Sequence, residues 1–153
     1  AERSLDGLST LSGRVTPAGV ITEYKATPVV GSIRAMTAGA DGNVWFVKDG
    51  QGGPAVGRVD PATGAATLFS TGLNGAFTLF GGMTLGGDGN VWFTSYFDGL
   101  IGRVTPAGTI TEYTGVAPNT QLNAITAGPQ VGGANTLWVT DPTNKSIAKL
   151  TLR

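Results

Sequence analysis

Short apolar runs alternate along this chain with turns that are rich in Gly, Asp, Asn and Pro. One run, Val44-Trp45-Phe46-Val47, has no polar position, so it predicts a strand that is buried on both faces. Similar runs return at 91–93 and 137–139. No window shows the apolar periodicity of a helix. The pattern therefore predicts an all-β fold made of short strands.

Two phrases recur in register and set the length of the repeat. The first contains the turn D-G-N followed by V-W-F, and its tryptophans, Trp45, Trp92 and the looser Trp138, are 47 and 46 residues apart. The second reads G-R-V-T-P-A-G at 13–19 and at 102–108, with a variant copy between them. A repeat of this length, built from strands and Gly-rich turns, is typical of propeller blades.

Each complete repeat predicts four strands. The D-G-N turn joins the first strand to the second, because Gly and Asn tolerate positive φ. The third strand begins at the Gly-Arg pair, and the fourth ends on Tyr24, Phe69 or Tyr113. We predict one partial β-propeller domain over residues 1–153. Its parts are a blade remnant at 11–24, complete blades at 33–70 and 81–114, and a partial blade at 122–152.

The predicted strands amount to about three and a quarter blades, fewer than the ~4 that usually close a ring. An incomplete ring exposes strand edges and an apolar blade face to water. We therefore expect a partner that completes the ring. Another copy of the chain and the missing blades of a longer chain are both open at this point.

Composition narrows the classes of partner. The 153 residues contain 10 Lys plus Arg and 10 Asp plus Glu, so no basic surface for nucleic acid is indicated. No run approaches the ~18 apolar residues of a membrane span. The chain has no Cys, which excludes disulfides and thiolate sites. This composition suits an extracellular or periplasmic bacterial protein, with a cytoplasmic one as the alternative, although residues 1–4 lack signal-peptide character.

The phrases T-A-G-x-D-G-N-V-W-F and I-G-R-V-T-P-A-G-x-I-T-E-Y resemble the blade signature of the virginiamycin B lyase (streptogramin lyase) family of seven-bladed propellers. The resemblance covers most of residues 13–151. It implies an enzyme that opens a cyclic depsipeptide antibiotic by elimination, with a histidine base and Mg²⁺ near the central channel. This chain contains no His. Where the family phrase often continues W-F-T-E, the chain has Lys48, Ser95 and Asp141.

Residues at identical repeat positions usually make the same structural contact in every blade. We therefore predict that the three tryptophans are buried at equivalent places. The recurring basic residues Arg14, Arg58, Arg103 and Lys149 are predicted to be structural rather than an anion-binding ring. Asp41 and Asp88 are explained by turn chemistry, because D-G-N lacks the alternating oxygen ligands of a calcium loop.

Candidate ligand contacts are the residues that break the repeat, in the loops that follow the second strand and precede the first strand of each blade. Those loops emerge on one face of a propeller, which usually carries the site. The candidates are Arg34, Lys48, Asp49, Tyr96, Phe97, Asp98, Asn123 and Asp141. Asp49, Asp98 and Asp141 are out of register with one another, so no metal site and no catalytic residue is assigned.

The function that these features favour is a non-catalytic binding or assembly module, needing no cofactor and binding a small molecule or glycan of unknown identity. The alternative is a fragment of a virginiamycin B lyase-like C–O lyase whose catalytic His and metal ligands lie outside these residues. Mg²⁺ would be a cofactor only in that second case.

Overall fold

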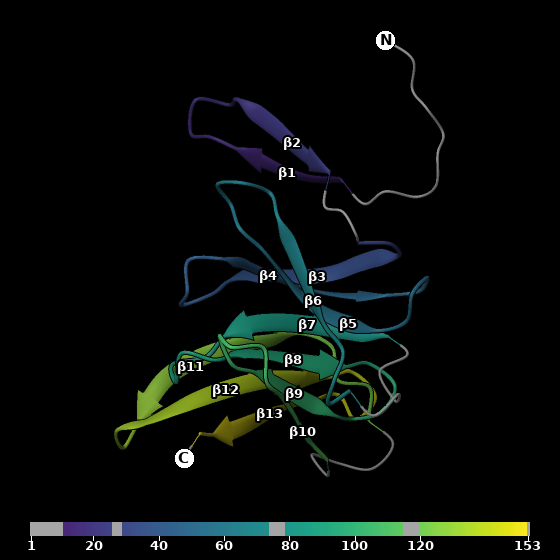
Figure 1. Ribbon diagram of the computed structural model, residues 1–153. Coiled ribbons are helices and arrows are strands. Elements are labelled where there is room, and N and C mark those ends of the chain that lie inside the picture. The colour runs from purple at the N-terminus through teal and green to yellow at the C-terminus, as the bar shows by residue number, and fades with distance from the viewer. Residues whose placement is uncertain (1–10, 26–28, 74–78, 115–119, 153) are drawn as a thin grey trace.

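The computed structural model describes residues 11–25, 29–73, 79–114 and 120–152. These residues form thirteen strands and no helix. The strands make four antiparallel sheets that follow one another in an arc, with the β1–β2 hairpin at one end and the β11–β13 sheet at the other (Figure 1). The predicted all-β partial propeller of four-stranded blades is confirmed, and the described sheets leave the ring open.

In each sheet the strands pair in chain order, so every blade is an antiparallel meander. The first two sheets are the hairpin β1 (Leu11–Val15) and β2 (Ile21–Lys25), and the blade β3 (Ser32–Ala38), β4 (Val44–Asp49), β5 (Ala55–Val59) and β6 (Ala66–Phe69). The last two are the blade β7 (Phe80–Leu85), β8 (Val91–Ser95), β9 (Ile101–Val104) and β10 (Ile110–Tyr113), and the three strands β11 (Ile125–Val131), β12 (Ala134–Asp141) and β13 (Ser146–Thr151).

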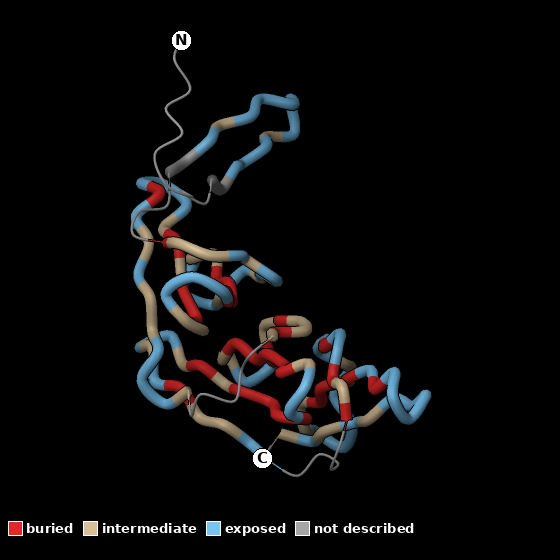
Figure 2. Tube along the Cα trace, turned by 90° about the vertical axis from the view of Figure 1, so that its right-hand side faces the viewer, coloured by how far each residue is buried: buried red, intermediate tan, exposed pale blue. Residues whose placement is uncertain are grey.

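The core lies between the sheets rather than within one of them. Side chains alternate across a strand, so neighbours in β4 point to different sheets. Trp45 packs in the cluster that joins the β3–β6 and β7–β10 sheets, whereas Phe46 packs on the other face with Val29 and Val59. Figure 2 shows the buried segments gathered in the second strands and between adjacent sheets. This arrangement explains why the second strand of each blade has no polar face.

The inner strands of neighbouring blades are joined by threonine hydroxyls. The ladder of β7 and β8 shifts between Phe80 and Met83. Thr94 Oγ1 accepts a hydrogen bond from Gly82 N at 2.9 Å and donates one to the Asn123 carbonyl at 2.7 Å, which links β8 to the segment before β11. In the next blade Thr140 Oγ1 accepts from Ala124 N at 3.0 Å. The threonine after Trp-Phe therefore satisfies a backbone donor that a register shift leaves outside the ladder.

Two of the three tryptophans are buried as predicted. Trp45 and Trp92 are 1% and 5% exposed. The prediction is wrong for Trp138, which is only half-buried. Among the described residues no sheet covers the face of β11–β13 on which its indole lies. The hairpin β1–β2 at the other end stands beyond the β3–β6 sheet (Figure 1), and Val15 and Ile21 are 67% and 71% exposed.

Candidate functional site

The residue three positions after each tryptophan lies at or next to the end of the second strand of its blade and bonds to the loop that follows. Ser95 Oγ donates to Asp98 Oδ2 at 2.8 Å. Asp141 accepts from the backbone N and the Nδ2 of Asn144 at 3.1 and 2.7 Å. Lys48, at the same repeat position, also bonds to the loop that follows it, but through a positively charged ammonium group. Sequence reasoning placed Lys48 and Asp141 in loops, and the structure instead places them in β4 and β12, both buried.

Lys48 is 1% exposed, which is rare for a lysine. Its Nζ donates to the carbonyl oxygens of Gln51 and Gly53 at 3.1 and 2.5 Å, so the ammonium group caps the loop after β4. Burial lowers the pKa of Lys48, and the neighbouring Asp49 carboxylate partly opposes that effect. Because its donors are directed at its own loop, the side chain serves local structure.

Arg34 and Asp49 are two predicted site residues that the structure brings together. Arg34 Nε donates to Asp49 Oδ2 at 2.7 Å, and their side chains are 43% and 5% exposed. The hydrogen bond that Arg34 donates to Asp49 raises the pKa of Arg34 above its ordinary value, although burial opposes the shift. Both residues were expected in loops, but Arg34 lies at the register shift of β3 and Asp49 ends β4. The exposed part of Arg34 remains open to a ligand.

Tyr96, Phe97 and Asp98 form the turn after β8, as expected. The rings of Tyr96 and Phe97 contact edge to face with centroids 5.1 Å apart, and Phe97 is 55% exposed. Asn123 is exposed and lies just before β11, where its backbone bonds to Thr94 and Thr140. Ligand binding by the eight candidates stays a prediction, because the contacts that place them are contacts within the chain.

The described residues also bear on metal binding and on membrane insertion. The part of the chain that the structure describes has no group of three His, Cys, Asp or Glu side chains that could hold a metal ion. Within those same residues, no helix is long and apolar enough to span a membrane.

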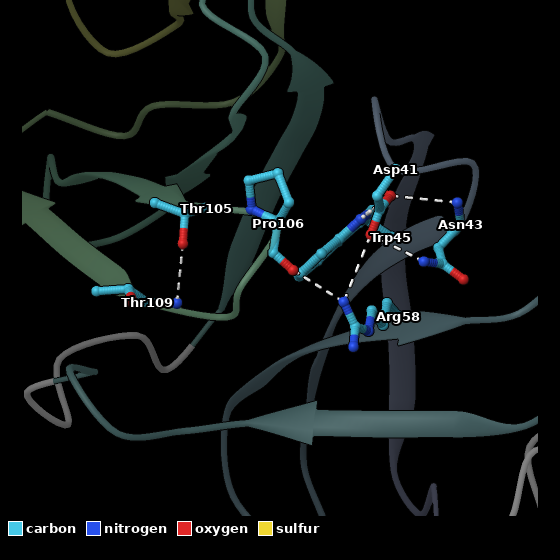
Figure 3. Close-up of polar contacts among 7 residues, drawn as sticks. All are labelled: Asp41, Asn43, Trp45, Arg58, Thr105, Pro106 and Thr109. Atoms are coloured by element: carbon cyan, nitrogen blue, oxygen red, sulfur yellow. Dashed lines mark hydrogen bonds and ion pairs between the residues drawn. The ribbon is translucent and has the colours of Figure 1, made fainter.

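The second blade (β3–β6) and the third blade (β7–β10) meet at a joint built around Trp45 and Arg58 (Figure 3). The indole of Trp45 stacks on the ring of Phe69 with centroids 5.6 Å apart. The guanidinium of Arg58 lies 5.8 and 5.6 Å from these two ring centroids, close enough for cation–π attraction. Its Nη1 also donates to the Pro106 carbonyl at 2.8 Å, in the T-P-A-G turn of the next blade. Arg58 therefore links two blades.

The aspartate of the D-G-N turn bonds to the indole of the same tryptophan, and its carboxylate also lies 3.5 Å from Arg58 Nη1 (Figure 3). Asp41 Oδ1 accepts from Trp45 Nε1 at 3.0 Å, and its carboxylate also accepts from the backbone N and the Nδ2 of Asn43 at 3.2 and 2.8 Å. Burial by itself raises the pKa of Asp41, but the hydrogen bonds from Asn43 and Trp45 outweigh it and hold that pKa below its usual value. Asp88 accepts from Trp92 Nε1 in the same way, at 3.1 Å.

From sequence, turn chemistry alone accounted for the two aspartates, and their hydrogen bonds from the tryptophan Nε1 atoms were missed. The signal was present, since Asp precedes Trp by four residues in two repeats and is absent from the third. In that third repeat the longer strands β11 and β12 are joined by the two-residue turn Gly132-Gly133 instead of D-G-N, and Trp138 Nε1 is buried with no hydrogen-bond partner. The structural role expected for Arg58 and Arg103 agrees with the contacts, since Arg103 lies over Trp92 and Tyr113 at 5.8 Å from each centroid.

Successive antiparallel sheets arranged in an arc, with a Trp-Arg-aromatic stack repeated in the two four-stranded blades, define the class of this protein as a β-propeller. The model of the virginiamycin B lyase family matches residues 9–153, so the chain belongs to that family. The sequence-based recognition is confirmed.

Three similar solved structures are streptogramin lyases. A virginiamycin B lyase from Staphylococcus aureus has 29% identity and a TM-score of 0.72, and the match covers 94% of this chain and 49% of the lyase. A streptogramin B lyase has 27% identity and a TM-score of 0.71, with 94% and 48% covered. A catalytically inactive histidine-to-alanine variant of the S. aureus enzyme, with quinupristin, has 26% identity, a TM-score of 0.70, and 94% and 49% covered.

The chain thus spans about half the length of these lyases. A putative gluconolactonase shares only the fold, at 19% identity and a TM-score of 0.59 over 99% of this chain and 48% of its own. No curated protein sequence matches this chain.

Proposed function

We propose that this chain is a non-catalytic assembly module, which supplies consecutive blades of a streptogramin-lyase-type propeller and joins further blades through its two outer faces. The observation that carries the proposal is the contrast between inner and outer faces. Val104 and Ile110 are 0% and 8% exposed where the third blade packs on the second. Val15 and Ile21, at the same repeat positions, are 67% and 71% exposed.

The local chemistry supports the absence of catalysis. The position at which the family phrase often has glutamate is occupied by Lys48, Ser95 and Asp141, and each side chain is bonded to its own loop. The chain also contains no His, whereas a histidine-to-alanine variant of the S. aureus lyase is inactive. A small molecule or glycan would contact the exposed parts of this rim, at Arg34 and Phe97.

The assembly role is tested by the native mass of the 153-residue chain at micromolar concentration, measured by light scattering. The chain is produced alone and together with the part of the S. aureus lyase that lies outside the match. We expect multiples of 15.5 kDa, or a complex with the added blades. A folded 15.5 kDa species that binds neither partner contradicts the proposal.

A second candidate is an enzyme fragment. It is favoured by the family match over residues 9–153 and by the 29% identity to the S. aureus virginiamycin B lyase. In that case the other blades supply the histidine, and Mg²⁺ is required. Incubation with a streptogramin B antibiotic and Mg²⁺, followed by mass spectrometry for the linearised product, separates the two. The module role predicts no product from the chain alone, and product above a no-protein control supports the enzyme.

A further inference from the structure

We infer that the partner is a second copy of this chain, and that the hairpin β1–β2 of one copy packs on the Trp138 face of the β11–β13 sheet of the other. The inference rests on the assembly role proposed above and names its partner and its contact. The apolar cluster between the second and third blades is the template. Val56, Val104 and Ile110 meet in it, and the residues at the same repeat positions, Ile147, Val15 and Ile21, are exposed.

The receiving half is the outer face of the last sheet. It contains a hollow of about 250 Å³ whose lining includes Thr126, Trp138, Thr140 and Ile147. Ile147 pairs with Thr140 and is 67% exposed. The residues at its repeat position in the two complete blades, Val56 and Ile101, are each 0% exposed because the next blade covers them. This apolar face therefore has the character of a blade surface whose neighbour is absent.

The inserting half is the outer face of the first hairpin. Val15 pairs directly with Ile21 across β1 and β2, so the two side chains share one face of the sheet. The equivalent pair, Val104 and Ile110, is buried in the cluster that contains Trp45. A hairpin that presents the same pair to a tryptophan-bearing face can form the same contact.

The turn of the hairpin is also preformed for this joint. Both T-P-A-G turns have a hydrogen bond of 2.8 Å from the glycine N to the threonine carbonyl, at Gly19 and at Gly108. At Gly108 a Cβ would overlap the ring of Phe69, since this turn lies against the preceding blade. At Gly19 nothing lies within 4 Å of the same position. The first turn thus has the shape that the second turn uses in its inter-blade contact, although a counterpart of Phe69 would need a fourth strand beyond the described β11–β13 sheet.

A second copy fits better than an unrelated protein, because one molecule carries both complementary halves. Such a joint is heterologous, so it closes into a ring where the rotation permits and otherwise continues as an open array. The chain has a formal charge of zero, and association of identical copies therefore meets no net repulsion. Two copies would supply about six blades, within the ~4 to 8 of closed propellers.

The test uses one aspartate substitution on each half, since an unpaired charge is strongly disfavoured in an apolar contact. Ile21→Asp disables the hairpin face and Ile147→Asp disables the receiving face. Matched controls are Val20→Asp, at a residue that is 58% exposed beside the hairpin face, and Thr143→Asp, in the exposed turn between β12 and β13. Far-UV circular dichroism verifies that all four variants fold, which their exposure favours.

We expect the wild-type chain and both controls to form the same oligomer at micromolar concentration in light scattering. Each face variant alone is expected at 15.5 kDa, because every joint needs one face that the variant lacks. An equimolar mixture of Ile21→Asp and Ile147→Asp copies retains one intact joint. It should therefore form a heterodimer of twice that mass, which does not grow further.

The outcomes separate this inference from the assembly role. A wild-type oligomer that persists in both face variants overturns the joint and leaves the assembly role standing. A wild-type monomer that binds the added lyase blades overturns the second-copy inference and supports completion by another segment. A wild-type monomer that binds neither overturns both. Failure of the variant mixture to form a heterodimer, with each variant monomeric, overturns the head-to-tail arrangement.

Discussion

The hydrogen bond between the D-G-N turn and the tryptophan predicts a measurable coupling. Asp41→Ala removes the acceptor of Trp45 Nε1, which is 3.0 Å away on a residue that is 1% exposed. An indole N–H left unpaired in a core costs about 1–3 kcal/mol, and loss of the two bonds from Asn43 adds about 1 kcal/mol. We therefore expect Asp41→Ala to lower the free energy of unfolding by about 2–4 kcal/mol. Asp41→Asn, which keeps an acceptor oxygen, should cost less.

The indole contribution can be isolated by a double-mutant cycle with Trp45→Phe, which keeps an aromatic ring beside Phe69 but removes the N–H. We expect a coupling of about 1–2 kcal/mol, the cost that the unpaired N–H adds to Asp41→Ala. The assay is urea unfolding followed by circular dichroism at one fixed protein concentration, because self-association would make stability concentration-dependent. Asp60→Ala, in an exposed turn, is the control and should show no coupling to Trp45→Phe.

A coupling within the ~0.3–0.5 kcal/mol at which distant sites are additive would refute the reasoning. In that case the bond from Asp41 to the indole contributes nothing beyond turn formation. The third repeat provides an internal comparison, because Trp138 has no acceptor and its blade is described with intact strand pairing.

Three further predictions follow from the same contacts. Gly108→Ala should lower the unfolding midpoint in urea more than Gly19→Ala, because both strain a positive φ but only the first meets Phe69; equal effects would contradict the inter-blade contact. Thr94→Val should destabilise the fold by about 1–3 kcal/mol, since two part-buried backbone groups lose their partner, and urea unfolding at no measurable cost would contradict this. The stability difference between wild type and Asp41→Asn should be present at pH 7 and decline below about pH 4, as the carboxylate with its lowered pKa is protonated; denaturation across pH 2–7 measures this, and a constant difference would count against it.

Much of the fold could be predicted from sequence because a repeat presents the same information several times. The two-sided apolar run at Trp45 and Trp92 predicted strands between blades, and the D-G-N turn predicted the hairpin before them. Partial exposure of Trp138 was not predictable from its own repeat. It depends on whether a neighbouring sheet covers its face, which is a property of the whole arrangement.

The rim was harder to predict than the scaffold. Lys48 and Asp49 followed the apolar run and carried charge, so they were expected in a solvent-facing loop, yet they are 1% and 4% exposed. Charged side chains can be buried when their hydrogen bonds are satisfied, and here backbone carbonyls and Arg34 satisfy them. Those partners come from a loop and from a shifted strand register, neither of which a local pattern specifies.

The residue three positions after each tryptophan shows how a propeller blade can change its side-chain chemistry while its backbone keeps the same arrangement. Lys48, Ser95 and Asp141 differ in charge, size and hydrogen-bonding direction, but each closes its strand and holds the loop that follows. By contrast, Arg58 and Arg103 repeat the same residue, because a planar guanidinium can lie over two aromatic rings, and Arg58 also reaches the next blade. Substitution is therefore tolerated at the rim and restricted at the joints.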